Sequence, residues 1–318
     1  MDKIKIITLG GLDESYKYMT LVEVNNDIFV IEAGVKFPDR TKPGIDYIIP
    51  RYDYLVENKQ KVRGYFLTQG HDSIIGALPY IYEKVPAPIY CSATTKVFFE
   101  QFCAHNRIDI NKFSFVIVKP SDDLLIKNRK ISLFQTACNM AESFGVAIST
   151  EQGNVVYISN FVVDNDQVKG FIHDIAKIGR IIENKTLVLL TDSTNVEFAG
   201  YCSPKYRLLP LVERQILESQ GRVFFAIDTP DFYNAVTILN FAIKSGRKII
   251  PYDENAREVV EIFRKTGFVN FDRDSILPLD EVNRARPQNL LIFMTGYSNK
   301  LNSKIALFWK KPIMCFQI

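Results

Sequence analysis

The stretch Thr68-Gln69-Gly70-His71-Asp72-Ser73-Ile74-Ile75-Gly76-Ala77-Leu78-Pro79 carries the most information in this sequence. It follows the apolar residues 64–67, which predict a buried strand, and it leads into residues 74–83, which predict the start of a helix. A polar loop between a strand and a helix is a common position for functional side chains, because the rigid elements hold it in place. We therefore expect the functional site at this loop.

The same stretch resembles the T-H-x-H-x-D-H-x-G-A-L-P signature of metallo-β-lactamase-fold hydrolases, and it is most similar to the ribonuclease J family of β-CASP nucleases. Further segments match this family in the same order along the chain. They are residues 9–11, residues 32–38 (the family's D-A-G-L-K-F-P with Glu32 in place of Asp), residues 44–50, and residues 192–195, which match the D-S-T that opens the β-CASP insertion. The resemblance implies an α/β fold, in which an incomplete metallo-β-lactamase-type αββα sandwich is followed by a β-CASP α/β domain.

Short strands that alternate with helices are predicted along the whole chain, which fits this layout. In the first part we expect strands at 4–9, 19–24, 27–31, 88–91, 130–135, 145–149, 154–158 and 186–190. We expect helices at 53–59 and at 166–183. A third helix should follow a Ser92 cap, with Val97, Phe98, Phe102 and Cys103 on its inward face. In the second part, strands at 223–227, 247–251 and 290–294 alternate with helices after Asp231 and at 254–266, which predicts a parallel sheet. The resemblance implies domains at 1–200 and 201–318, and we expect the family's return segment and C-terminal domain to be absent.

The metal ligands of the family motif are largely replaced in this sequence. The resemblance implies His, His, Asp and His at positions 69, 71, 73 and 74, where they help to hold two metal ions that activate the attacking water. This chain has Gln69, His71, Ser73 and Ile74. Metal ions of this kind prefer imidazole nitrogen and carboxylate oxygen, whereas glutamine and serine are poor ligands and isoleucine has no donor atom.

Two further ligand positions of the family are replaced as well. Residues 136–146 are similar to the family stretch T-T-H-S-I-P-D-S-V-G-V, and its histidine is Cys138 here. Residues 156–161 are similar to V-x-T-G-D-F, where the aspartate that bridges both metals is Asn160. Asp192 is the one carboxylate that is kept, so Ser73 and Asp192 are vestigial catalytic positions. Because a cysteine thiolate binds zinc, Cys138 and His71 still offer half of a metal site.

Each of these residues also has a plain structural interpretation. His71 fits a histidine that only supports the loop, Cys138 fits a small buried apolar residue, and Asp192 fits the cap of a turn or helix. His105 and His173 fall on predicted helices outside every motif, so we expect them at the surface.

The composition is that of a globular chain, with 47% hydrophobic and 24% charged residues. No apolar run approaches the roughly 18 residues that cross a bilayer, and the N-terminus has no signal-peptide layout, so we expect a cytoplasmic protein without membrane contact. The five cysteines form no C-x-x-C pair, which favours reduced thiols. The net charge of +3 neither demands nor excludes nucleic acid.

Three hypotheses about function follow. The first is a catalytically degenerate ribonuclease J-like protein, a non-catalytic partner of an active ribonuclease J paralogue or an RNA-binding subunit, in RNA processing and mRNA decay. The second is a metal-dependent ribonuclease or hydrolase with one zinc at a reduced site of His71, Cys138, Asp192 and Asp72. The third is a decayed, truncated gene product with an uncovered apolar sheet edge. The replaced ligands favour the first, a pseudoenzyme that requires no cofactor.

Overall fold

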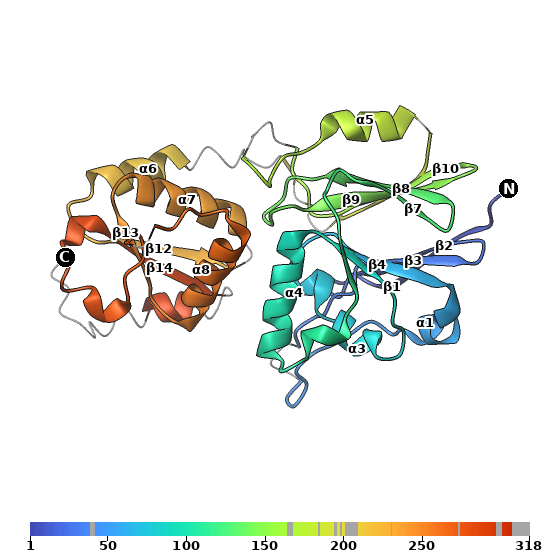
Figure 1. The fold of residues 1–318 in the computed structure, drawn as a ribbon, viewed down its shortest axis with the longest axis horizontal. Helices are drawn as coiled ribbons and strands as arrows, with labels where there is room; N and C mark the ends of the chain where they lie inside the picture. The colour runs from blue at the N-terminus through green and yellow to red at the C-terminus, as the bar shows by residue number, and fades with distance from the viewer. Residues whose placement is uncertain are drawn as a thin grey trace. The chain divides into compact units, whose positions relative to one another are not determined.

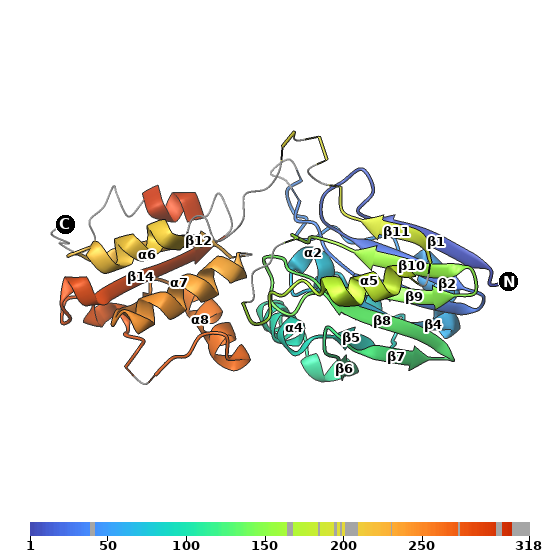
Figure 2. The same ribbon diagram turned by 90° about the horizontal axis from the view of Figure 1, so that it is seen from above.

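The computed structural model describes residues 1–38, 42–163, 168–183, 185–193, 196–197, 199–200, 209–229, 231–272, 274–296 and 301–306. The chain divides into two compact units, residues 1–199 and residues 200–318. Figures 1 and 2 show the ribbon of each unit from two directions, and each unit is described by itself below.

The first sheet of unit 1–199 has six strands in sequence order. They are β1 (Ile4–Gly10), β2 (Met19–Val24), β3 (Asp27–Ile31), β4 (Val62–Leu67), β5 (Ile89–Cys91) and β6 (Phe115–Ile117). The pairs β1–β2 and β2–β3 are antiparallel, and the later pairs are parallel. Asn25 turns the β2–β3 hairpin with φ of 57°, a left-handed conformation that asparagine tolerates well.

The second sheet of this unit has five strands in the order β11-β10-β9-β8-β7. They are β7 (Asp123–Ile126), β8 (Arg129–Gln135), β9 (Phe144–Thr150), β10 (Gly153–Ile158) and β11 (Thr186–Thr191). One apolar core contains inward residues of both sheets, among them Phe29 and Phe66 from the first sheet and Val146 and Val155 from the second. The two sheets therefore pack face to face.

Helices cover the two outer faces of this pair of sheets (Figure 1). The helices α1 (Asp53–Glu57), α2 (Asp72–Ile75), α3 (Leu78–Tyr82) and α4 (Ala93–His105) bury apolar side chains against the first sheet. Helix α5 (Ile175–Glu183) packs Ile178 and Ile181 against Phe134 and Val156 of the second sheet. The short 3-10 helices η1 (Lys59–Lys61) and η2 (Ile110–Lys112) lie in connections. The expected metallo-β-lactamase-type αββα sandwich is confirmed.

Unit 200–318 contains a parallel three-stranded sheet in the order β12-β14-β13. Its strands are β12 (Val223–Asp228), β13 (Lys248–Pro251) and β14 (Leu290–Gly296), and its helices are α6 (Leu209–Glu218), α7 (Phe232–Lys244) and α8 (Glu254–Thr266), with 3-10 turns η4 (Leu279–Glu281) and η5 (Pro287–Asn289). Asp231 caps α7 and Asp253 caps α8 through side-chain hydrogen bonds. This βαβα arrangement is the α/β domain that the β-CASP resemblance implies.

Three expectations about helices are wrong. The helix predicted at 74–83 is two short helices, because His71 caps α2 at its start and Pro79 opens α3. The helix predicted at 166–183 begins at Ile175, since residues 168–174 are not helical and 164–167 lie outside the described residues. On α4, Phe102 and Cys103 are buried as expected, but Phe99 is buried in place of Val97 and Phe98, which are half-buried.

Within the described ranges, no helix combines the length and the apolar character that crossing a membrane requires.

Candidate functional site

The motif loop begins where β4 ends, and it is buried over most of its length. Thr68, Gln69, Ser73 and Ile74 are each at most 3% exposed. Backbone hydrogen bonds tie the loop to its neighbours: the Ser73 carbonyl accepts the Tyr18 N–H at 3.2 Å, and the Ile74 carbonyl accepts the Ala33 N–H at 2.7 Å. These bonds fix the former ligand positions firmly in space.

Gly34 explains how the motif loop packs so closely on the segment after β3. A Cβ atom added to Gly34 would lie 1.4 Å from the carbonyl oxygen of Ser73. Only glycine fits at this position, because any side chain would overlap the backbone of the loop. The glycine at position 34 of the matched 32–38 segment is thus required by the packing of the motif loop.

His71 is engaged inside its own loop. Its Nδ1 accepts the Ser73 N–H at 3.1 Å, which caps α2, and lies 2.6 Å from the Ser73 Oγ. A backbone N–H can only donate, so this pattern assigns the proton of the neutral ring to Nε2. Burial lowers the pKa of His71, against the opposing charge of Asp72, and the Tyr16 ring stacks on the imidazole with centroids 6.5 Å apart. His71 is therefore a neutral, capping histidine.

Gln69 and Cys138 are brought together from two different loops. The Cys138 thiol is 4% exposed, and its Sγ lies 3.5 Å from the Gln69 Oε1 and 3.0 Å from the Ser143 Oγ. The Met140 N–H donates to the same sulfur at 3.2 Å. The Gln69 Nε2 is buried and has no hydrogen-bond partner within the part of the chain that the structure describes.

Ile74 and Asn160 occupy different surroundings. Ile74 is fully buried in the apolar core of the first sheet, so this position, where the resemblance implies a ligand, is a core position. Asn160 follows β10, is half-buried and has φ of 50°, a conformation that asparagine adopts more readily than most residues.

Asp192 follows β11 and lines a cleft of 510 Å³ together with Tyr18, Tyr157 and Ser159. Asp13 and Glu14 lie on the same cleft, which gives it an acidic lining. Thr194 and Asn195, the rest of the matched D-S-T segment, lie outside the described residues.

His105 and His173 differ in how well they were predicted. His105 is the exposed last residue of α4, as expected. The expectation for His173 is wrong, because it lies in the loop before α5, half-buried, with its ring stacked on Phe161 at 5.8 Å. Among the described residues, its buried Nδ1 has no hydrogen-bond partner, and burial lowers the pKa of His173.

Glu32 is a buried acid beneath the motif that sequence reasoning did not single out. It is fully buried, with φ of 65°, and accepts hydrogen bonds from the Thr68 N–H at 3.2 Å and from the Thr68 hydroxyl. Burial raises the pKa of this carboxyl to about 8, although the bonds from Thr68 and Tyr157 oppose the shift. The replacement of the family's aspartate at this position was the available clue.

The side chains of the motif do not fit a two-metal centre. Ile74 offers no donor atom, the Nδ1 of His71 is used by the helix cap, and Cys138 is hydrogen-bonded to its own loop. Among the described residues, no group of three or more His, Cys, Asp or Glu side chains is arranged to hold a metal ion. The one-zinc site of His71, Cys138, Asp192 and Asp72 therefore stays a prediction.

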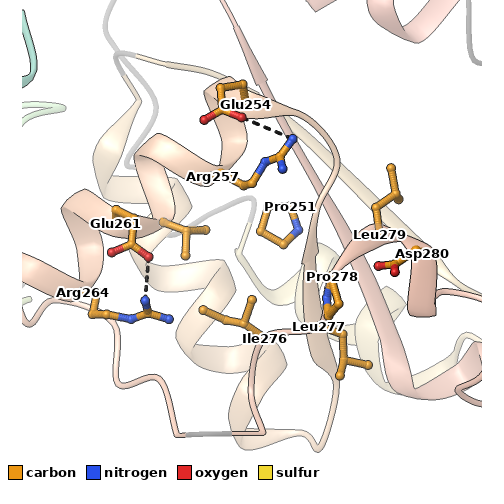
Figure 3. A pocket seen from close by; sticks show the side chains of 11 residues that line it. Pro251, Glu254, Arg257, Glu261, Arg264, Ile276, Leu277, Pro278, Leu279 and Asp280 are labelled. Carbon is orange, nitrogen blue, oxygen red and sulfur yellow. Dashed lines mark hydrogen bonds and ion pairs between the residues drawn. The ribbon is translucent and has the colours of Figure 1, made fainter. Parts of the chain in front are cut away.

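Unit 200–318 has a cleft of its own, of 620 Å³, between α8 and the segment 276–280 (Figure 3). Pro251, at the end of β13, lies at its centre, with Ile276 nearby (Figure 3). The two arginines on its α8 wall are already paired: Arg257 lies 3.3 Å from Glu254, and Arg264 lies 2.6 Å from Glu261. None of the predicted site residues lies here.

Comparison with known proteins gives relatives by sequence. A scan against models of protein families finds no match. The chain is 33% identical over 293 residues to ribonuclease J 2 of Staphylococcus aureus strain MRSA252, and 30% identical over 293 residues to ribonuclease J 2 of Staphylococcus epidermidis. Each match covers 92% of this chain and 52% of the relative, so the chain spans about half the length of these relatives.

A solved structure supports the fold. A protein of unknown function from Enterococcus faecalis V583 matches with a TM-score of 0.58 over 94% of this chain and 78% of its own length, at 12% sequence identity. At that identity the likeness concerns the fold alone. The sequence similarity to the staphylococcal proteins goes further, because 293 matched residues must include parts of both units. Over 293 residues, this chain is therefore similar in sequence to about half of the length of these ribonuclease J 2 proteins.

Proposed function

We propose that this chain is a catalytically degenerate ribonuclease J-like protein. It acts without cleaving RNA itself, as a partner of an active ribonuclease J paralogue or as an RNA-binding subunit, in RNA processing and mRNA decay. Its relatives carry the name ribonuclease J 2, which connects the family to RNA.

The observation that carries this proposal is that Ile74, at a position where the resemblance implies a histidine ligand, is a residue of the apolar core. A fully buried isoleucine replaces a histidine ligand, and the backbone bond from Ala33 keeps the position fixed. A loop that is held this firmly does not bring another donor into the same place without local unfolding. Together with Gln69, Ser73, Cys138 and Asn160, this residue argues against a two-metal, water-activating site among the described residues.

A binding role is supported by the retained frame and by the surface of β11. The fold is kept although the implied metal ligands are replaced, and such a fold can still bind a partner protein or RNA. On β11, Leu187 and Leu189 are 40% and 58% exposed, and no described strand pairs with its outer edge. Uncharged, apolar strand edges of this kind are places where a partner strand adds to a sheet.

The proposal is tested with the purified chain, an active ribonuclease J paralogue and a labelled single-stranded RNA. We expect no RNA cleavage by the chain alone with Mn²⁺ or Zn²⁺, and a stable complex with the paralogue or with the RNA. Leu189→Lys is expected to weaken the paralogue complex, because a charge would enter the exposed edge.

Leu125→Lys is the matched control. Leu125 is 74% exposed on β7, the opposite edge strand of the same sheet, so its substitution should leave the complex unchanged. Metal-dependent cleavage by the chain free of any partner would refute the proposal, and so would a failure to bind either the paralogue or RNA.

A further inference from the structure

Two loops meet at the substituted motif, and side chains join them directly. The first loop, residues 68–74, follows β4, and the second, residues 136–143, connects β8 to β9. In a two-metal centre, ligands from both loops would be held together by the ions between them. Here the side chains at two of these positions are in direct contact: the Cys138 thiol donates a hydrogen bond to the Gln69 Oε1 at 3.5 Å.

Cys138 is the centre of this contact. Its sulfur accepts the Met140 N–H at 3.2 Å and lies 3.0 Å from the Ser143 Oγ. The Ser143 hydroxyl in turn donates to the Met140 carbonyl at 2.9 Å, which closes a tight turn around the thiol. All of these atoms are buried, since Cys138, Met140 and Ser143 are at most 4% exposed.

Backbone bonds extend the same contact on both sides. The Phe144 N–H donates to the Thr68 carbonyl at 3.1 Å, across the two loops. The Thr136 N–H donates to the Ser143 carbonyl at 2.9 Å, across the base of the second loop. These two backbone bonds form only when both loops keep a fixed geometry. The hydrogen bonds of Gln69, Cys138 and Ser143 lie next to them in the same loops.

We propose that Gln69, Cys138 and Ser143 form a metal-independent lock that takes over the structural role of the ions. The lock holds the two loops in the geometry of the family frame with no ion present. A buried hydrogen bond is costly to break, because its donor and acceptor are then left unpaired and shielded from water. The lock concerns the stability of the loops and does not depend on which partner the protein binds.

The proposal predicts how amide hydrogen exchange in the two loops responds to metals and to substitution. The full chain is measured after treatment with EDTA and after dialysis with Zn²⁺ or Mn²⁺. We expect the same protection of residues 68–74 and 136–144 in all three conditions, and the same melting temperature within about 1 °C, a shift well below that of a 1 kcal/mol change.

Substitutions locate the lock. Cys138→Ala is expected to speed exchange in both loops by about tenfold or more, and Ser143→Ala should do the same to a smaller extent while removing only one hydroxyl. Cys138→Ser retains a donor and an acceptor, so it should restore part of the protection. Cys103→Ala is the matched control: Cys103 is buried to 1% exposure on α4 in an apolar cluster, and its loss should leave exchange in the two loops unchanged.

Two results would overturn the lock. One is a metal-dependent rise in loop protection or melting temperature in the unmodified chain. The other is unchanged exchange of both loops in Cys138→Ala and Ser143→Ala. Either result would leave the proposed binding function standing, because that function fails only if the chain cleaves RNA alone or binds neither the paralogue nor RNA.

Discussion

The Nδ1 of His71 lies 2.6 Å from the hydroxyl oxygen of Ser73 and accepts the Ser73 backbone N–H at 3.1 Å. The single histidine that the motif retains is thus turned toward its own helix. At two positions where the resemblance implies a metal ligand and a catalytic group, this chain forms a helix cap.

Removing this cap should weaken the loop without abolishing the fold. We expect His71→Ala to lower the free energy of unfolding by about 1 kcal/mol, the usual cost of a lost N-cap. His71→Asn should change it by less than about 0.5 kcal/mol, because asparagine is a good cap. Urea unfolding monitored by circular dichroism gives both values, and equal losses in the two variants would contradict the capping role.

Glu32 should make stability depend on pH. Its folded pKa of about 8 lies above the ordinary value of 4.5, so the folded state binds a proton that the unfolded state releases between these values. The stabilisation from Glu32 is therefore complete below pH 4.5 and is lost as the pH rises through 8, on the order of 4 kcal/mol in all. In Glu32→Gln, urea unfolding at several pH values should show a flatter decline from pH 5 to pH 8. An unchanged slope would contradict the raised pKa.

Replacing glycine by alanine should change the free energy of unfolding in opposite directions at Gly34 and at Gly179. Gly34→Ala places a methyl group against the Ser73 carbonyl, and we expect it to lower the free energy of unfolding by about 3 kcal/mol or more. Gly179 lies exposed in the middle of α5 with open space around it, so Gly179→Ala should stabilise by up to about 1 kcal/mol. Thermal unfolding of the two variants checks both signs.

Arg247 should be essential for unit 200–318. It is 5% exposed, and its guanidinium donates to the carbonyls of Ile216, Ser219, Gly221 and Leu290. Lysine lacks this fork of donors, so Arg247→Lys should cost about 3 kcal/mol. Arg264→Lys, at the exposed face of α8, should cost less than about 0.5 kcal/mol, and equal losses measured by urea unfolding would count against the role of Arg247.

Local sequence patterns predict a strand or helix well where turn or capping residues in the sequence mark its ends. The hairpin of β2 and β3 was predicted to the residue, because two apolar runs flank a single Asn-Asn turn. The caps Ser92 and Asp231 likewise form as expected. Helix α6 and the short edge strands β6 and β7 were missed, since their stability depends on packing against distant parts of the chain.

The candidate site could be located but not built from the sequence. The motif frame gave the positions of Gln69, His71, Ser73, Ile74, Cys138 and Asn160. The burial of Glu32, the capping role of His71 and the contact between Gln69 and Cys138 all depend on residues that meet only in three dimensions. The half-buried position of His173 was mispredicted for the same reason, because it is set by Phe161 and not by a helical pattern.

The metal content of the reconstituted protein distinguishes a metal-free site from a one-metal and a two-metal site. The purified chain is dialysed with Zn²⁺ and Mn²⁺, freed of loosely bound ions, and analysed by elemental mass spectrometry. We expect no stoichiometric metal, because Ile74 is a core residue, His71 caps α2, and Cys138 is hydrogen-bonded to Gln69. Two tightly bound ions per chain would contradict this expectation outright, and a single ion lost in both His71→Ala and Cys138→Ala would establish the reduced zinc site in its place.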